Sequence, residues 1–136
     1  MMTITTKTQY GILALLELAE HYQKELVQIS DIVRRRSVPK NYIEQILNRL
    51  TKTGMVKSVR GNKGGYVLGV HPDNLTLIAI IEALEGEIRL DNGHLSAALT
   101  EVLEKIKNTV RDMLNISLSQ LLERQKILDQ QIMFAI

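Results

Sequence analysis

The sequence predicts a mainly α-helical fold that carries one small β-hairpin. Two helical patterns, Ser30 to Arg36 and Pro39 to Lys52, are separated by only two residues, which is the spacing of a helix-turn-helix. Two short apolar segments, Val56 to Val59 and Tyr66 to Leu68, then flank a glycine-rich turn, the pattern of a hairpin. Helix, helix and hairpin in this order predict a winged helix-turn-helix, followed here by a long C-terminal helix.

Basic residues gather in the first half of the chain. The whole chain has a net charge of +2, but residues 1 to 70 hold 11 Lys and Arg against 5 Asp and Glu, a net +6. Between residues 34 and 63, nine basic residues, among them the run Arg34 to Arg36, stand against one acid, Glu44. A solvated surface is the simpler explanation of a single basic run. Here the excess coincides with the helix and turn that would lie on a duplex, so we interpret it as a phosphate-binding face.

Length and composition limit the class of protein. A chain of 136 residues with 45% hydrophobic content suits one compact domain plus an extension, and one Phe with no Trp means an aliphatic core. The chain has no cysteine, which excludes disulfides and thiolate ligands. The first residues lack the apolar core of a signal peptide, and no apolar run reaches membrane-spanning length. We therefore expect a cytoplasmic protein with no membrane association.

The first helix is expected to begin near Thr6, because Thr6 and Gln9 resemble a capping box. Free amide groups and the helix dipole favour anions at such an end. Thr5, Thr6 and Lys7 are therefore candidate contacts to the DNA backbone. Ordinary helix capping explains the threonines as well, and the two roles are compatible.

The second and third predicted helices begin with suitable residues. Ser30 is expected to cap the second helix, and Pro39 lies at or beside the first position of the third, where its missing N–H costs little. Gly54 is a suitable C-terminal stop. Apolar residues of the third helix recur at the spacing of a core-facing stripe: Ile43, Ile46, Leu47 and Leu50.

The opposite face of the third helix is polar. The N-terminal turns of a recognition helix reach base edges, so we assign base reading to five residues there. Gln45 suits adenine, Glu44 can accept from the amino group of cytosine, and Lys40 suits guanine or phosphate. A solvated helix face is the simpler explanation of any one residue taken alone. The five are Lys40, Asn41, Tyr42, Glu44 and Gln45, with Arg49 and Lys52 assigned to the DNA backbone.

Glu44 differs from its basic surroundings. Phosphate repels a carboxylate, so Glu44 weakens binding unless it finds a donor on a base. We hypothesise that it discriminates among DNA sites.

The turn that follows, Arg60 to Gly65 (RGNKGG), is basic and rich in glycine. Glycine permits positive φ and close approach to another molecule. A nucleotide-binding loop is the alternative, but the turn lacks the Gly-Lys-Ser/Thr ending and a following helix. We therefore assign it to the wing, with Arg60 in the minor groove, Lys63 on a phosphate, and Gly61 and Asn62 beside them.

The remaining residues predict further helices. One helix is expected from Leu77 to Leu84, capped by Thr76 and ended by Gly86, and Asp91 to Gly93 marks a turn. Ser117 is expected to cap the last helix.

Between these two helices, apolar residues recur in strides of three and four from Leu95 to Met113, which indicates a long helix that pairs with another. This is more apolar surface than a small winged helix needs to cover. We therefore predict a DNA-binding domain at residues 1–86 and a linker with a helical dimerisation region at residues 87–136. A homodimer would place two recognition helices about 34 Å apart, one turn of DNA. The alternative is a helical cap folded back within one monomer.

With these residues identified, the chain resembles the Rrf2 family of bacterial transcriptional regulators. The resemblance covers residues 4 to 90 and returns from Ile116 to Asp129; its most specific segments are TKTQYGILALLELA, NYIEQILNRLTKTGMVKSVRGNKGGYVLG and ALEG. It implies a dimeric winged-helix repressor or activator. It also implies that Glu44 takes part in base discrimination, that Arg60 enters the minor groove, and that Asn41, Tyr42 and Gln45 lie on the recognition helix.

The chain departs from that family in one respect. Many members hold a [2Fe–2S] cluster on three cysteines, but the corresponding segment here, Gly86 to Thr100, contains none. Asp91 and His94 make a poor metal site, and His21 and His71 lie far away in sequence. We therefore predict no cluster, metal or other cofactor. The signal would be a small-molecule effector, a partner enzyme, or none.

Taken together, these patterns indicate a transcriptional regulator, a repressor, that binds a pseudo-palindromic operator in double-stranded DNA as a homodimer. The alternative is a protein-interaction module that uses the same winged-helix face to bind an acidic partner. The tyrosines, glutamates and histidines of the chain show no nucleophile–base or metal-ligand spacing, so the sequence does not predict an enzyme.

Overall fold

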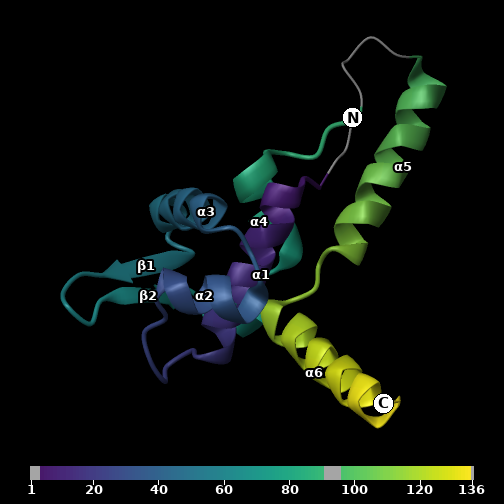
Figure 1. Cartoon of the computed structure of the whole chain (residues 1–136). Coiled ribbons are helices and arrows are strands. Elements are labelled where there is room, and N and C mark those ends of the chain that lie inside the picture. Colours follow the sequence, from purple (N-terminus) through teal and green to yellow (C-terminus); the bar gives the residue numbers. More distant parts are fainter. Residues whose placement is uncertain (1–3, 91–95, 136) are drawn as a thin grey trace.

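The computed structural model describes residues 4–90 and 96–135. Figure 1 shows a helical body from which a hairpin projects on one side and two long helices extend on the other. The predicted mainly helical fold with one hairpin is confirmed. The expected turn at Asp91 to Gly93, and with it the candidate ligands Asp91 and His94, lies outside the described residues. In chain order the elements are α1 (Thr6–Glu20), α2 (Ile29–Arg36), α3 (Lys40–Thr53), β1 (Val56–Val59), β2 (Gly65–Leu68), the 3₁₀ helix η1 (Pro72–Asn74), α4 (Leu77–Glu85), α5 (Ala97–Met113) and α6 (Leu118–Ala135).

An aliphatic core joins α1, α3 and the start of α6. The four apolar residues expected to face the core from α3 are fully buried, and they share one cluster with Leu15 of α1 and Leu118 of α6. At Gly11 a Cβ would lie 3.0 Å from Ile46 Cγ2 and 2.9 Å from Leu84 Cδ1, so α1 approaches α3 and α4 where it has no side chain. This close approach explains a glycine inside a helix, where it otherwise lowers stability.

The N-terminal caps of α1 and α2 differ from those predicted. Thr5 rather than Thr6 caps α1, since its hydroxyl accepts from Thr8 N–H at 3.2 Å. The side chain of Gln9 donates to the Ile4 carbonyl, so it does not complete a capping box. Several neighbouring threonines suit the role, and the sequence pattern placed the cap one residue late.

The prediction that Ser30 caps α2 is wrong. Val27 exchanges two backbone hydrogen bonds with Tyr66 of β2, so the chain is extended up to that residue. The helix can then start immediately afterwards, with Gln28 as its N-cap, and Ser30 lies within its first turn. At the other end Ser37, with φ 53°, turns the chain into α3, and Gly54, with φ 82°, ends α3 as predicted.

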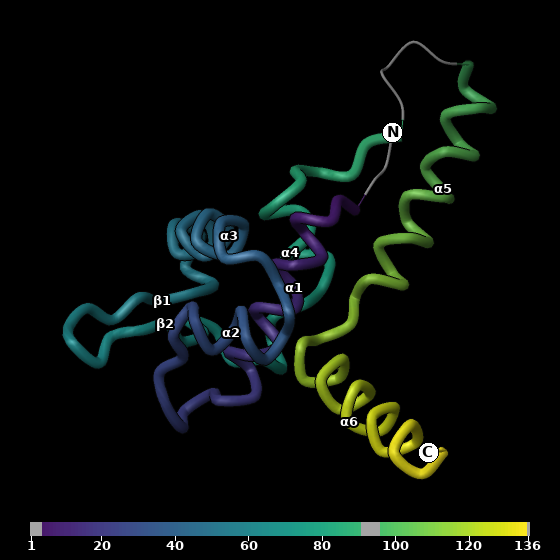
Figure 2. Tube along the Cα trace, in the orientation of Figure 1, coloured from purple at the N-terminus to yellow at the C-terminus, as the bar shows by residue number. Residues whose placement is uncertain are grey.

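The hairpin pairs β1 and β2 antiparallel, with Val56 opposite Leu68 and Val59 opposite Gly65. Val27 adds one bridge outside this pair, and the side chain of Gln28 donates to the Gly64 carbonyl at 3.3 Å. These contacts tie the part of β2 next to the turn to the start of α2. The hairpin projects from the helical body (Figure 2).

A bend between α5 and α6 is hydrogen-bonded to the start of α4. Leu77 N–H donates to the Ile116 carbonyl, and Leu118 N–H donates to the Leu75 carbonyl, both at 2.8 Å. Ser117 caps α6 as expected, accepting from Gln120 N–H at 3.1 Å. Within the described ranges, no helix is long and apolar enough to cross a bilayer.

Candidate nucleic-acid interface

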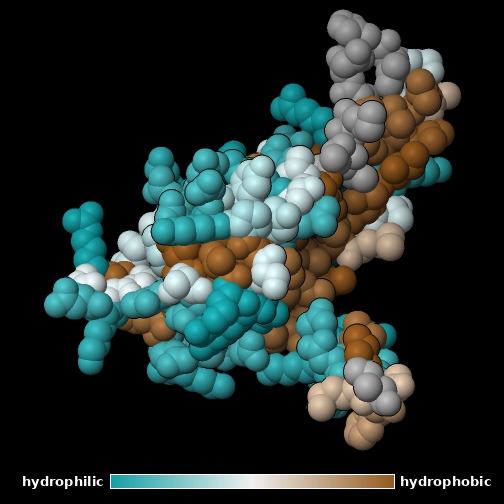
Figure 3. Space-filling view, in the orientation of Figure 1, coloured by the Kyte–Doolittle hydropathy of each residue, from teal (hydrophilic) through white to brown (hydrophobic). Residues whose placement is uncertain are grey.

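The polar face of α3 is exposed as the sequence predicts. All five candidate base-reading residues at its N-terminal end are exposed, as are Arg49 and Lys52 farther along. The buried face holds the helix against the core, so these side chains are presented on a rigid element. The hydrophilic surface over α3 and the hairpin is visible in Figure 3. The roles of these residues in DNA contact stay predictions.

Three candidate residues on α3 already have partners within the protein. Lys40 Nζ lies 3.8 Å from Glu44 Oε1, one helical turn away, and both side chains are at least half exposed. The rings of Tyr42 and Tyr10 of α1 lie 5.8 Å apart between centroids. Glu44 is therefore loosely paired and free to exchange partners, whereas Tyr42 is supported from α1 although 45% of it remains exposed.

The tip of the hairpin carries the four predicted wing residues, Arg60, Gly61, Asn62 and Lys63, all exposed. Gly61 has φ 127°, which favours glycine, and Gly64 N–H donates to the Gly61 carbonyl at 2.9 Å to close the turn. Arg60 and Lys63 thus belong to the turn of a hairpin that projects from the helical body near α3 (Figure 1).

The carboxylate of Glu85 is hydrogen-bonded at the N-terminus of α1. Thr6 and Lys7 are exposed, but the Thr5 hydroxyl and the buried Thr8 hydroxyl both donate to Glu85 Oε1. The proposed backbone contact by Thr5 therefore starts from a side chain that is already hydrogen-bonded within the protein.

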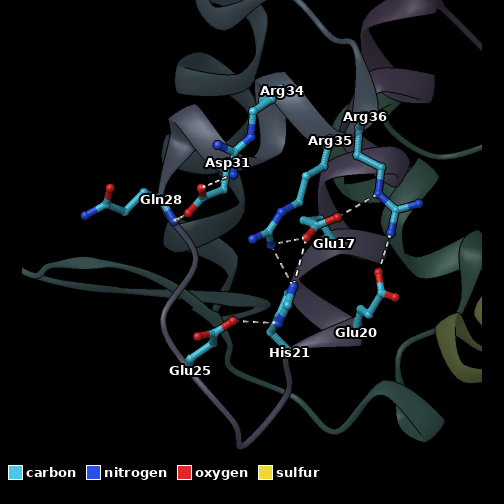
Figure 4. A network of polar contacts seen from close by, with 9 residues as sticks. All are labelled: Glu17, Glu20, His21, Glu25, Gln28, Asp31, Arg34, Arg35 and Arg36. Atoms are coloured by element: carbon cyan, nitrogen blue, oxygen red, sulfur yellow. Dashed lines mark hydrogen bonds and ion pairs between the residues drawn. The ribbon is translucent and has the colours of Figure 1, made fainter.

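Arg34 to Arg36 are paired with acids of the same chain and are not available in full to phosphate. Figure 4 shows Arg35 and Arg36 of α2 directed at Glu17 of α1. Arg35 Nη1 lies 2.9 Å from Glu17 Oε2, and Arg36 Nε lies 3.0 Å from Glu17 Oε1. Arg36 also reaches Glu20 at 3.0 Å, and Arg34 reaches its helix neighbour Asp31 at 3.1 Å. The basic surface is therefore concentrated on α3 and the wing.

Glu17 is a buried anion, with 2% of its side chain exposed. Burial raises its pKa, but hydrogen bonds from Arg35, His21 and Arg36 and the charge of Arg36 outweigh burial and hold the pKa below the ordinary value of 4.5. The carboxylate therefore stays ionised and fixes α2 to α1. Since α2 packs against α3, this network also helps to orient α3.

Sequence reasoning missed Glu17. The available signal was an acid inside the apolar run LLELA, followed later by three consecutive arginines. A carboxylate on a buried helix face needs a hydrogen-bonded cationic partner, because an unpaired buried charge is too costly. The run of arginines supplies that partner.

The described geometry defines a class of protein. An exposed polar helix, held by a second helix and flanked by a basic hairpin, is the winged helix-turn-helix, a DNA-binding architecture. Residues 4–124 match the model of the Rrf2 family, described as an iron-dependent transcriptional regulator, and the chain belongs to that family. It is a DNA-binding transcriptional regulator and not an enzyme.

Individual relatives agree with this placement. The chain is 35% identical to the transcriptional regulator IscR of Erwinia tasmaniensis, over 93% of this chain and 82% of that protein. It is 40% identical to the transcriptional regulator CymR of Bacillus subtilis, over 64% of this chain and 63% of that protein.

Solved structures give the same result. The structure of CymR, the global cysteine regulator of B. subtilis, matches with a TM-score of 0.83 and 32% identity over 91% of this chain and 98% of that one. The structure of T. potens IscR matches with a TM-score of 0.77 and 34% identity, over 91% of this chain and 88% of that one.

The iron dependence in the family description does not fit the residues of this chain. Iron–sulfur clusters are held mainly by cysteine thiolates, and the chain has no cysteine. Across residues 4–90 and 96–135, no group of three or more His, Asp or Glu side chains is placed to hold a metal ion.

The substitution Glu17→Gln should lower the free energy of unfolding by about 3 kcal/mol, because it removes the carboxylate that Arg35 and Arg36 share and leaves Arg36 only its pair with Glu20. The depressed pKa of Glu17 adds a pH dependence. Its contribution is fully present above pH 4.5 and is lost as the pH falls through the folded-state pKa, so the wild type should lose more stability on acidification than the variant. Denaturant unfolding between pH 7 and pH 3 measures both effects.

The exposed Glu25, substituted as Glu25→Gln, is the matched control and should change stability by less than about 1 kcal/mol. Equal effects of the two substitutions would contradict the role of Glu17.

Proposed function

We propose that this protein acts as a homodimer that represses transcription by occupying a pseudo-palindromic operator, with α3 in the major groove and the wing in the minor groove. The observation that supports this most strongly is that one chain combines the exposed polar face of α3 with a projecting hairpin whose turn carries exposed basic residues. Family membership supports transcriptional regulation, and the names of the relatives say the same of those proteins. We expect the protein to act in the cytoplasm and to respond to a small-molecule effector or a partner enzyme.

In this proposal the two DNA-facing elements have different tasks. The N-terminal end of α3 reads base edges through Lys40, Asn41, Gln45 and their neighbours, because side chains there are exposed on a rigid helix. Arg60 enters the minor groove, where a narrow groove concentrates negative potential. Lys63, Arg49 and Lys52 neutralise phosphates and supply affinity without sequence preference.

The face of α5 supports a homodimer. Leu99, Val102, Ile106 and Met113 are large apolar side chains that are 44% to 70% exposed, and the apolar side of this helix is visible in Figure 3. Contiguous apolar surface of this kind marks an interaction site. Residues 1–86 would then form the DNA-binding part and residues 87–136 the linker and dimerisation part.

The spacing of these residues suits an antiparallel pair of α5 helices. Leu99 and Met113 each lie seven residues from Ile106, and Val102 and Val110 each lie four residues from it. In two antiparallel helices related by a twofold axis, a residue meets the one equally far beyond the axis. An axis at Ile106 therefore places Leu99 against the partner's Met113, and apolar side chains meet along the whole stripe.

The substitution Arg60→Ala should weaken binding to the operator about tenfold, since it removes a charged contact in the minor groove. Operators are first selected from genomic fragments retained by the purified protein, and affinity is then measured at several salt concentrations. The exposed Arg124 of α6, substituted as Arg124→Ala, removes the same charge far from α3 and should change affinity little. Wild-type affinity that is insensitive to salt, or equal for operator and random duplex, would contradict the proposed function and favour the protein-interaction alternative.

The substitution Glu44→Ala should relax sequence preference without abolishing binding. The carboxylate repels phosphate, so its removal favours every duplex, while the discrimination that it provides at one base pair is lost. Selection of binding sites from a random library by the wild type and the variant measures this directly. Loss of affinity by the same factor for all sequences would refute a role for Glu44 in discrimination.

The substitution Ile106→Cys should give a dimer linked by a disulfide under mild oxidation. The chain contains no other cysteine, so any cross-link joins the introduced residues. Leu99→Cys is the control: in the antiparallel register two copies of residue 99 lie about 21 Å apart along the axis, too far for a disulfide. A mixture of Leu99→Cys and Met113→Cys should cross-link again. A monomeric protein in sedimentation, or efficient cross-linking of Leu99→Cys alone, would contradict this register.

A further inference from the structure

The carboxylate of Glu85, the last residue of α4, is held at the start of α1. Its Oε1 accepts from the Thr5 hydroxyl, from the Thr8 hydroxyl and from the Thr5 N–H, the last at 3.3 Å. These hydrogen bonds and the nearby positive charge of Arg49 on α3 hold the pKa of Glu85 below the ordinary value of 4.5, so the group is ionised at neutral pH.

The negative charge of Glu85 lies close to residues that are predicted to bind the negatively charged DNA backbone. Thr5 and Arg49 are both predicted contacts to the DNA backbone, and they belong to two different elements, α1 and α3. A carboxylate fixed on Thr5 and Thr8 repels phosphate there, and its charge also acts on the nearby Arg49. Glu85 is also exposed, so its charge is presented at the protein surface.

We propose that Glu85 limits the affinity of this protein for DNA. Its carboxylate competes with the phosphates of the DNA backbone for Thr5 and Arg49, and so lowers the affinity by electrostatic repulsion. The inference rests on the proposed function. It assigns a role in DNA binding to Glu85, which is neither a base-reading residue nor a wing residue. A purely structural role for the same hydrogen bonds makes the opposite prediction for DNA binding, because loss of the contact would then disturb α1 and weaken the interface.

The substitution Glu85→Gln tests the proposal, because it removes the charge and keeps a side chain that can accept from both hydroxyls. Affinity is measured for the full chain on a duplex of random sequence at fixed, moderate salt, since the effect concerns the backbone and requires no operator. We expect binding about fivefold tighter than that of the wild type, the size of one charge–charge interaction over a few ångströms in water.

Glu87→Gln is the matched control. Glu87 is an exposed acid two residues away whose carboxylate lies 3.8 Å from Arg89, so it changes the net charge equally without touching Thr5 or Arg49. It should alter affinity by less than about twofold, because screening weakens charges that lie farther from the duplex. In an Arg49→Gln background the increase in affinity caused by Glu85→Gln should be smaller, since part of the effect of Glu85 acts through that arginine.

The outcomes separate the two proposals. If the wild type binds duplex with the usual salt dependence but Glu85→Gln binds no more tightly than Glu87→Gln, this inference is overturned and the proposed function stands. If Glu85→Gln and the second variant Glu85→Ala both lose the folded state in thermal melting, Glu85 is structural and the inference is likewise overturned. If the wild type shows no salt-dependent affinity for any duplex, the proposed function itself fails.

Discussion

The ion pair between Glu17 and the two arginines of α2 is the interaction on which the arrangement of the DNA-binding body depends. The aliphatic core holds α1 and α3 together through Leu15, Ile46 and their neighbours, but aliphatic packing is non-directional and leaves the angle of a short helix weakly defined. The eight residues of α2 bury only Ile32, so the helix has little apolar surface of its own to define its place. Two guanidinium groups directed at one buried carboxylate supply the missing direction. A buried ion pair of this kind adds little net stability, but breaking it is costly, and here it specifies one arrangement of α2.

This pairing also divides the basic residues of the chain into two groups with different consequences. Arg35 and Arg36 are neutralised by Glu17 and Glu20 within the body. The basic side chains of α3 and the wing remain exposed, and the acid nearest to them on α3, Glu44, is paired at only 3.8 Å with Lys40. The charge at the surface of α3 and the wing is therefore set by exposed side chains, whereas the charges of Arg35 and Arg36 are held by Glu17 and Glu20. In the proposed function the exposed residues contact DNA, and the paired residues help to orient α3.

The sequence predicted features that depend on neighbouring residues, and it did not predict features that depend on contacts between distant parts of the chain. The spacing of Ile43, Ile46, Leu47 and Leu50 predicted the buried face of α3, and Gly54 its end, because helix periodicity and a left-handed C-terminal residue are local properties. The cap of α2 was predicted wrongly because its start is decided by the pairing of Val27 with Tyr66, almost forty residues away in the chain. The contact of Glu85 with Thr5 was invisible for the same reason, since it joins the end of α4 to the start of α1. The candidate base-reading and wing residues were placed on exposed positions, but exposure does not show which of them touches DNA.

The bend between α5 and α6 links the predicted dimer face to the DNA-binding body more tightly than a flexible connection would. Leu118 is fully buried in the same core as α3, so the first residue of α6 is packed into the body. Backbone hydrogen bonds from Leu77 to Ile116 and from Leu118 to Leu75 then fix the end of α5 against α4, and Arg111 of α5 pairs with Glu82 of α4. Because both ends of this connection are anchored to packed elements, the direction of α5 is tied to the direction of α3. Two copies joined along α5 would therefore hold their recognition helices at a distance set by the packing of the body, and a change in the packing of α4 would alter that distance and with it the fit to two half-sites on DNA.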